Sequence, residues 1–275
     1  MYRNTFLSVM FLACCFNGSL CAQSDAQIYE RTCDAKTYPF SDPSPVATPN
    51  NSYYPYFRFD GFSMQAQEKQ WKMVVLENDY VKLTVTPEIG GKIWGAIDKV
   101  NNKEFVYTNG VVKFRDVAMR GPWTSGGIEF NFGIIGHAPT CSTPIDYLTK
   151  KNVDGSVSCH IFSYEWITRT VWNVEISLPK DKAYFTTHTT WFNQSSIDQP
   201  YYQWMNAGYA TKTGTRFYYP GTYSIGHSGD LHPYPIDEEG RDVSWYDNNN
   251  FGASKSLHII GDYNDYFGIY WHNEK

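Results

Sequence analysis

The sequence lacks the motifs that mark the best-known ligand and cofactor sites. It has no glycine-rich phosphate loop, no serine nucleophile elbow and no cysteine–histidine spacing of a zinc site. No stretch after the first residues is long and apolar enough for a membrane helix, so no membrane span is expected. The sequence therefore favours a function that needs no organic cofactor.

Cysteine is also scarce once the start of the chain is set aside. Residues 1–22 combine Arg3 with the apolar run FLSVMFLACCF and small residues near Ala22, a pattern typical of a cleaved signal peptide. Its removal leaves three of the six cysteines, Cys33, Cys141 and Cys159. An odd number argues against a disulfide-dense scaffold, although one bridge stays open. We expect an exported protein, periplasmic or extracellular, rather than one anchored through a lipidated cysteine.

An excess of positive charge is missing as well. Without Arg3, the count of Lys and Arg falls from 23 to 22, against 28 Asp and Glu. A mildly acidic chain gives no support to nucleic-acid binding. Aromatic residues are plentiful instead, at 17% of the chain with 22 tyrosines and 9 tryptophans. Such rings occur in carbohydrate clefts, but β-strands favour them too, and both explanations apply here.

Apolar alternation predicts an all-β fold of stacked sheets. Val81, Leu83 and Val85 alternate with polar residues, and the segment from Thr170 to Leu178 does the same. Between such segments the chain turns at PEIGG, KVNNK and LPKDK, and GDYND is read as the turn of a hairpin joining LHII to YFGIYW. No segment carries a long helical period. We predict an irregular, proline-rich arm over residues 23–70 and one β domain over residues 71–275.

The segment RGPWTSGGIEFNFGIIGH, from Arg120 to His137, is the main candidate site. Glycines allow close approach of backbone to a ligand, an arginine donates forked hydrogen bonds, and glutamate and histidine transfer protons. Trp123 offers a flat apolar face, whereas Glu129 and Asn131 lie on the side of the strand opposite to Ile128 and Phe130 if the segment is extended. This mixture suits a polyhydroxylated ligand. A structural alternative pairs Glu129 with Arg120.

Further candidates lie later in the chain. Asn206 belongs to the strand-like string QWMNAGY, and Tyr219 precedes a polar loop that contains His227. Trp245 follows the acidic turn DEEG, whose simplest interpretation is a solvated loop. An acid/base carboxylate or a calcium site stays open at this turn.

Several of these strings resemble known families. ENDYVKLTVTPEIGGKIWGAID is similar to the opening of galactose-mutarotase-like domains. RGPWTSGGIEFNFGIIGH, YPIDEEGRDVSWY and NNNFGASKS together resemble an uncharacterised exported bacterial family, domain of unknown function 5107, often followed by tetratricopeptide repeats. The resemblance implies a β-supersandwich with a sugar-binding cleft on its concave face. Because Lys275 follows directly on YWHNE, we expect the chain to be the N-terminal part of such a sandwich.

The resemblance also implies site residues and a reaction. Arg120 and His137 align with sugar-contacting positions, but the strand that carries a second histidine in mutarotases has Asn206 here. His227 or His232 could replace that second histidine, and His227 is the catalytic candidate. We expect acid/base chemistry at the anomeric centre of a mono- or oligosaccharide, with Glu129, His137 and His227 as catalytic candidates. The substrate-binding candidates are Arg120, Trp123, Asn131, Asn206, Tyr219 and Trp245. The alternative is a non-catalytic carbohydrate-binding or assembly module.

Overall fold

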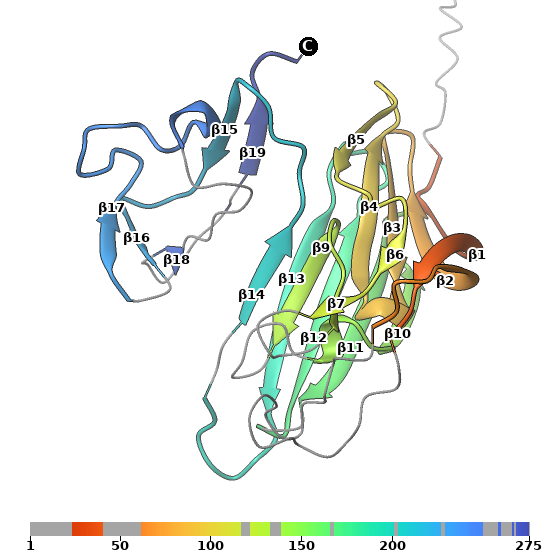
Figure 1. The fold of residues 1–275 in the computed structure, drawn as a ribbon. Coiled ribbons are helices and arrows are strands. Elements are labelled where there is room, and N and C mark those ends of the chain that lie inside the picture. The colour runs from red at the N-terminus through yellow and green to blue at the C-terminus, as the bar shows by residue number, and fades with distance from the viewer. Residues whose placement is uncertain are drawn as a thin grey trace, which may run out of the picture.

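The structure is a computed structural model that describes residues 24–40, 62–116, 122–132, 139–165, 168–200, 203–226, 229–249, 258–259, 266 and 268–274. Within these residues the helical elements are three short 3-10 turns, η1 (Pro87–Ile89), η2 (Pro139–Cys141) and η3 (Tyr246–Asn248). Strands form the rest of the regular structure, as Figure 1 shows. The predicted all-β class is confirmed.

The larger sheet has eight strands. Its order is β14, β9, β4, β3, β2, β1 and β6, with β5 paired to β4. All neighbours are antiparallel except β1 and β6. The strands are β1 (Gln27–Tyr38), β2 (Gln67–Glu77), β3 (Val81–Thr86), β4 (Lys92–Asp98), β5 (Lys103–Val106), β6 (Val112–Lys113), β9 (Ile128–Phe132) and β14 (Gln203–Ala207).

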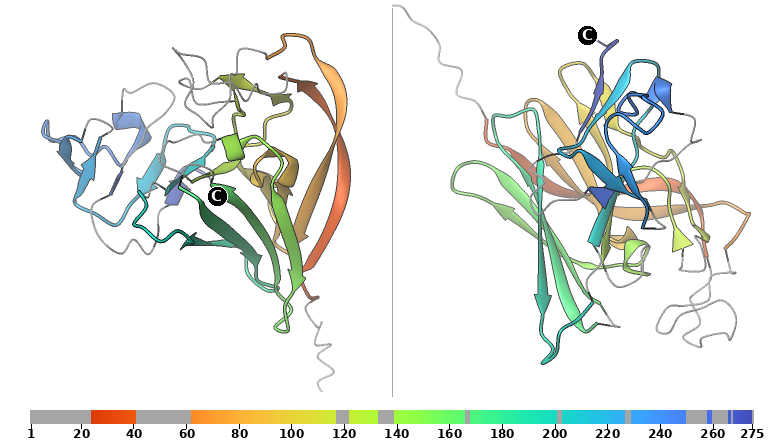
Figure 2. Two further views of the ribbon diagram at one scale, coloured as in Figure 1. Left: turned by 90° about the horizontal axis from the view of Figure 1, so that it is seen from below. Right: turned by 90° about the vertical axis from the view of Figure 1, so that its left-hand side faces the viewer.

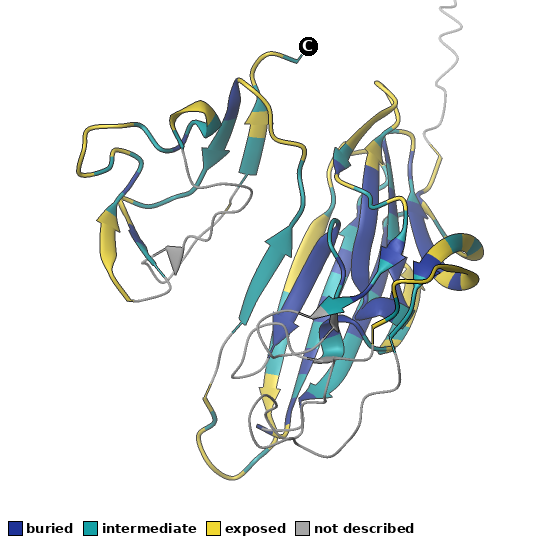
Figure 3. Cartoon of the chain, in the orientation of Figure 1, coloured by how far each residue is buried: buried dark blue, intermediate teal, exposed yellow. Residues whose placement is uncertain are grey.

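A four-stranded antiparallel sheet packs face to face against the larger one. It contains β10 (Asp146–Lys151), β11 (Val157–Glu165), β12 (Thr170–Leu178) and β13 (Thr186–Asn193), in that order. Alternate residues of β3 and β12 are buried, as their sequences predicted, and Figure 3 shows the buried positions gathered between the sheets. Phe132 of β9 stacks on Trp172 of β12 with 4.4 Å between ring centroids. The sandwich core is therefore closed by contacts from both sheets.

Short strands form a smaller lobe that lies beside the sandwich, on the side of β14 (Figures 1 and 2). β15 (Thr215–Tyr218) pairs with β19 (Gly268–Trp271), and β16 (Tyr223–Ile225) pairs with both β17 (Leu231–Pro233) and β18 (His258–Ile259). Near the sandwich, β7 (Arg115–Asp116) pairs with β8 (Pro122–Trp123).

Two expectations about local structure were wrong. Part of the segment expected to be irregular, Gln27–Tyr38, forms β1, which pairs with β2 from Gln27 to Thr37 and with β6 at its end. Its side chains are mostly exposed, so backbone hydrogen bonds rather than a buried apolar face keep it in the sheet. Second, β18 and β19 do not pair as one hairpin; they join β16 and β15 respectively. The proline-rich string that starts at Ser41 lies outside the described residues.

Candidate functional site

A tight glycine turn brings β9 against β4. Gly126 and Gly127 have positive φ angles of 75° and 66°. A Cβ atom on Gly127 would lie 2.3 Å from the carbonyl oxygen of Ile93, so only glycine fits there. The Gly127 amide donates a hydrogen bond of 2.8 Å to the carbonyl of Tyr107. These contacts explain the glycines of the TSGGIEF string and fix where β9 begins.

Alternation along β9 divides its side chains between two faces. Ile128, Phe130 and Phe132 belong to the sandwich core, so Glu129 and Asn131 project from the opposite face, as predicted. Both polar side chains are nevertheless buried, at 2% and 1% exposure. The Asn131 amide donates a hydrogen bond of 2.8 Å to the Glu129 carboxylate. The strand therefore carries a buried carboxylate–amide pair on the face that points away from the sandwich core.

Strand β14 extends this polar face. Asn206 lies directly opposite Glu129, and Trp204 lies opposite Asn131. Partners in an antiparallel pair point to the same side of the sheet. Asn206 and Trp204 are half-buried, unlike the β9 pair. Glu129, Asn131, Trp204 and Asn206 are called the polar face below.

A lysine that the sequence analysis missed lies beside this face. Lys92, the first residue of β4, is only 1% exposed, and its ammonium donates to the carbonyl and hydroxyl oxygens of Thr124, with 3.1 Å to the hydroxyl. Burial lowers the pKa of Lys92, and the charge of Glu129 acts in the opposite direction. One feature of the sequence could have identified Lys92 as a candidate. It directly follows Gly90 and Gly91, at the start of an otherwise mostly apolar strand.

Trp123 comes close to the same lysine from another element. The Lys92 Nζ atom is 5.9 Å from the centre of the Trp123 ring and 6.0 Å from that of Trp94. Both distances lie at the outer limit of cation–π attraction. The structure therefore brings three predicted residues, Glu129, Asn131 and Asn206, onto one face. Trp123 lies near this face through its contact with Lys92.

Cys141 also lies close to Glu129. Its thiol is fully enclosed, and burial raises its pKa well above the usual range; the negative charge of Glu129 adds to this rise. The loop that carries Cys141 packs on the Gly-Gly turn, because a Cβ atom on Gly90 would lie 2.5 Å from the Cys141 carbonyl carbon. Cys33, Cys141 and Cys159 all carry free thiols.

The remaining predicted residues divide into two groups. Arg120, His137 and His227 lie outside the described residues. Tyr219 and Trp245 belong to the smaller lobe. The Tyr219 ring meets Tyr234 edge-on at 5.8 Å, and the Trp245 ring lies 4.9 Å from His272. Both aromatics therefore contact residues of the lobe.

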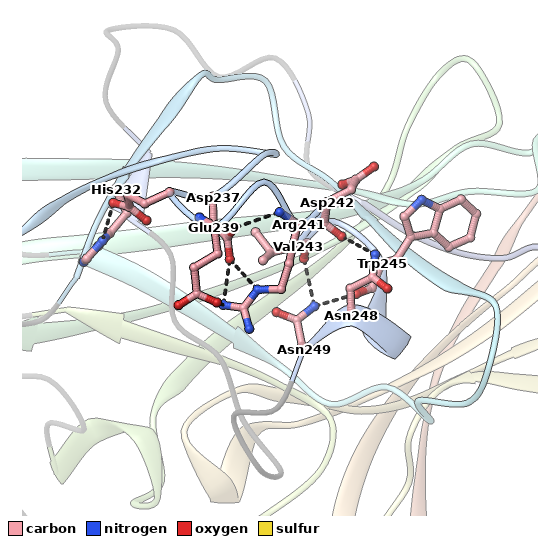
Figure 4. Close-up of polar contacts among 10 residues, drawn as sticks. His232, Asp237, Glu239, Arg241, Asp242, Val243, Trp245, Asn248 and Asn249 are labelled. Carbon is pink, nitrogen blue, oxygen red and sulfur yellow. Dashed lines mark hydrogen bonds and ion pairs between the residues drawn. The ribbon is translucent and has the colours of Figure 1, made fainter.

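In the acidic turn after Pro235, Arg241 pairs with Asp237 and Glu239. Asp237 accepts hydrogen bonds from the backbone and side chain of Arg241, which lower the pKa of its carboxyl, and Figure 4 shows this pairing together with that of Glu239. In the part of the chain that the structure describes, no group of three or more His, Cys, Asp or Glu side chains is arranged to hold a metal ion. Within the same residues, no helix has the length and apolarity needed to cross a membrane.

Comparison with known proteins agrees with the resemblance drawn from the motifs. A solved structure, that of a TPR-domain containing protein from Parabacteroides distasonis ATCC 8503, is similar with a TM-score of 0.69 and 25% identity. The match covers 81% of this chain and 38% of that protein, so the chain spans well under half of its relative's length. Residues 48–275 match the family described as Domain of unknown function (DUF5107). The chain therefore belongs to that family.

Proposed function

We propose that this chain is the carbohydrate-active part of an exported protein and binds a mono- or oligosaccharide at the polar face. One observation carries the proposal: the register of β9 and β14 places Glu129 opposite Asn206 and Asn131 opposite Trp204. A carboxylate, two amides and an indole on one side of a sheet match the hydroxyls and C–H faces of a sugar. Trp123, near Lys92, supplies a second indole.

In this proposal the chemistry takes place at the anomeric centre of the sugar. Glu129 transfers the proton, and Asn206 holds a hydroxyl beside it because the two side chains are cross-strand neighbours. Lys92 places its amino group near the carboxylate without contacting solvent, and burial lowers the pKa of this lysine. Arg120 and His137, which the sequence places in the same string, would complete the site. The reaction class is epimerase- or mutarotase-like, or glycoside hydrolysis.

A second function, a non-catalytic carbohydrate-binding module, is favoured by the burial of the β9 pair. Glu129 and Asn131 are 2% and 1% exposed and are joined by a hydrogen bond. If a ligand meets only the half-buried β14 side chains, Asn206 and Trp204, it is bound without proton transfer. The TPR domain named for the similar structure suggests a larger protein in which such a module would be joined to partner-binding repeats.

The decisive experiment compares binding and turnover in the full-length protein. Glycan screening measures binding, while anomer exchange of free sugars and hydrolysis of aryl glycosides measure turnover. If the chain is an enzyme, Glu129→Gln lowers turnover by about 10²-fold or more with binding retained. If it is a module, no turnover occurs and Asn206→Ala weakens binding. The control Glu104→Gln changes an exposed carboxylate of β5, in the same sheet, and should alter neither. A wild-type protein that binds no glycan contradicts both functions.

A further inference from the structure

One face of the β15–β19 ribbon gathers aromatic and polar side chains that the polar face does not use. Arg216 lies opposite Tyr270, and Tyr218 lies opposite Gly268. Residues two apart on a strand share a side, so Arg216, Tyr218, Tyr270 and the following His272 project from one face of the ribbon. Trp245 joins them through its bridge to Arg216. Arg216, Tyr218, Trp245, Tyr270 and His272 are called the ribbon platform.

The members of the ribbon platform contact one another closely. The His272 ring lies 4.9 Å from Trp245 and 4.7 Å from Tyr270, between centroids. Its Nε2 atom forms a hydrogen bond of 2.8 Å with the Tyr218 hydroxyl. The Arg216 guanidinium lies 5.0 Å from the Trp245 ring and 5.2 Å from that of Tyr218. The five side chains thus form one connected cluster.

Two asparagines hydrogen-bond to the backbone that carries Trp245. The side-chain amide of Asn249 donates to the carbonyl oxygens of Val243 and Trp245, at 2.9 and 2.5 Å, and that of Asn248 donates to the Asp242 carbonyl at 2.9 Å. Figure 4 shows these bonds, with the indole directed away from the Asp237–Arg241 turn. A fixed aromatic ring loses little entropy when a ligand stacks on it.

The ribbon platform has exposed ring surface and open space. Tyr270 is 55% exposed. At Gly268, which lies between Tyr218 and Tyr270 on this face, no heavy atom of the described residues lies within 4 Å of the position that a Cβ atom would take. A flat ring can therefore approach Tyr270 without displacing a side chain of those residues.

Charges on the ribbon platform are balanced within the lobe. Asp242 lies 3.7 Å from the Arg216 guanidinium, and the Ser244 hydroxyl accepts a hydrogen bond of 3.1 Å from its Nε atom. A platform built to hold phosphate or sulfate would leave its arginine with a surplus positive charge. Exposed rings together with hydroxyl, imidazole and guanidinium groups fit a neutral, polyhydroxylated ligand.

We propose that the ribbon platform is a second carbohydrate-binding site, separate from the polar face, which stacks a neutral sugar ring on Tyr270 beside Trp245 and His272. The inference rests on the proposed function for the class of ligand, a carbohydrate. It does not depend on the same residues, because the ribbon platform and the polar face share no side chain.

The test measures binding of neutral oligosaccharides to the full-length protein by calorimetry, using glucan, mannan and xylan fragments as probes. Tyr270→Ala should raise the Kd about tenfold, whereas Tyr270→Phe, which keeps the ring, should stay within about twofold of wild type. Tyr184→Ala removes a tyrosine of nearly equal exposure, 53%, in a turn of the sandwich and serves as the matched control. Far-UV circular dichroism confirms that the variants are folded.

Each result separates this inference from the proposed function. Weaker binding in Tyr270→Ala but not in Tyr184→Ala supports the ribbon platform. Binding that is weakened by Asn206→Ala and unaffected by Tyr270→Ala overturns the platform and leaves the polar face standing. A platform that prefers sulfated or uronic oligosaccharides, or proline-rich peptides, over the neutral probes also overturns the inference. A protein that binds none of the glycans overturns both.

Discussion

The side-chain amide of Asn131 donates a hydrogen bond of 2.8 Å to the carboxylate of Glu129, two residues earlier on the same strand. Both residues are almost completely buried, so water cannot replace the amide as a donor. A buried hydrogen bond that is lost is not replaced by one to water, so its contribution to stability is lost with it. This pair therefore contributes to the stability of the fold as well as to the candidate site.

Asn131→Ala should lower the free energy of unfolding by about 1–3 kcal/mol, measured by urea denaturation. Asn101→Ala is the matched control, because its amide makes a 2.7 Å hydrogen bond to the carboxylate of Asp98 in an exposed turn. That loss should cost at most about 1 kcal/mol, since water takes over the contact. Equal costs for the two variants would contradict the burial argument.

Lys92 and Glu129 should be energetically coupled. Lys92→Met removes a buried amino group whose charge acts on the Glu129 carboxylate, so we expect the free energy of unfolding to fall by about 3 kcal/mol. In the double variant Lys92→Met/Glu129→Gln, part of that loss should return because the carboxylate charge that interacts with Lys92 is removed as well. Denaturation of the four proteins of this cycle measures the coupling. Strictly additive losses would show that the two side chains act independently.

The buried thiol of Cys159 should make the protein less stable in alkali. Burial raises the pKa of Cys159 from 9.0 to about 12. Between these values the unfolded chain loses the thiol proton while the folded chain keeps it, so the stabilising contribution is complete below pH 9 and disappears as pH approaches 12. One such group changes the free energy of unfolding by ~1.4 kcal/mol per pH unit.

Replacing this thiol gives the corresponding test. Urea denaturation between pH 8 and 10.5 should show a shallower decline for Cys159→Ala than for wild type, even though the variant is less stable at pH 7 because a small cavity forms. The free energy of unfolding of Cys159→Ala should still fall somewhat with pH, because burial also raises the pKa of Cys141. An unchanged slope would mean that Cys159 is accessible to solvent.

The glycine turn before β9 should tolerate no side chain. Gly127→Ala combines a positive φ with a Cβ atom 2.3 Å from the Ile93 carbonyl oxygen. Gly240→Ala has a similar φ of 77° but open space within the described structure, so it isolates the backbone strain. We expect about 1–2 kcal/mol of destabilisation for Gly240→Ala and clearly more for Gly127→Ala, measured by thermal unfolding. A smaller effect at Gly127 would mean that the turn can shift.

The sequence by itself determined the strands whose residues alternate between core and surface. β3 and β12 could be predicted because a half-buried strand needs an apolar residue at every second position. The same rule placed Glu129 and Asn131 on one side of β9. The three family strings identified the family.

Only the tertiary structure decided which segments meet. β1 carries no apolar face that would reveal it, and its place depends on hydrogen bonds to a strand about 40 residues away. The burial of Lys92 depends on the loop that brings Thr124 above it, and Asn206 reaches Glu129 through the register of two strands that are distant in sequence. The contact between the Trp245 and His272 rings likewise joins residues that are distant in sequence. Alternation describes one strand's environment, whereas pairing between distant strands depends on the free energy of the whole fold.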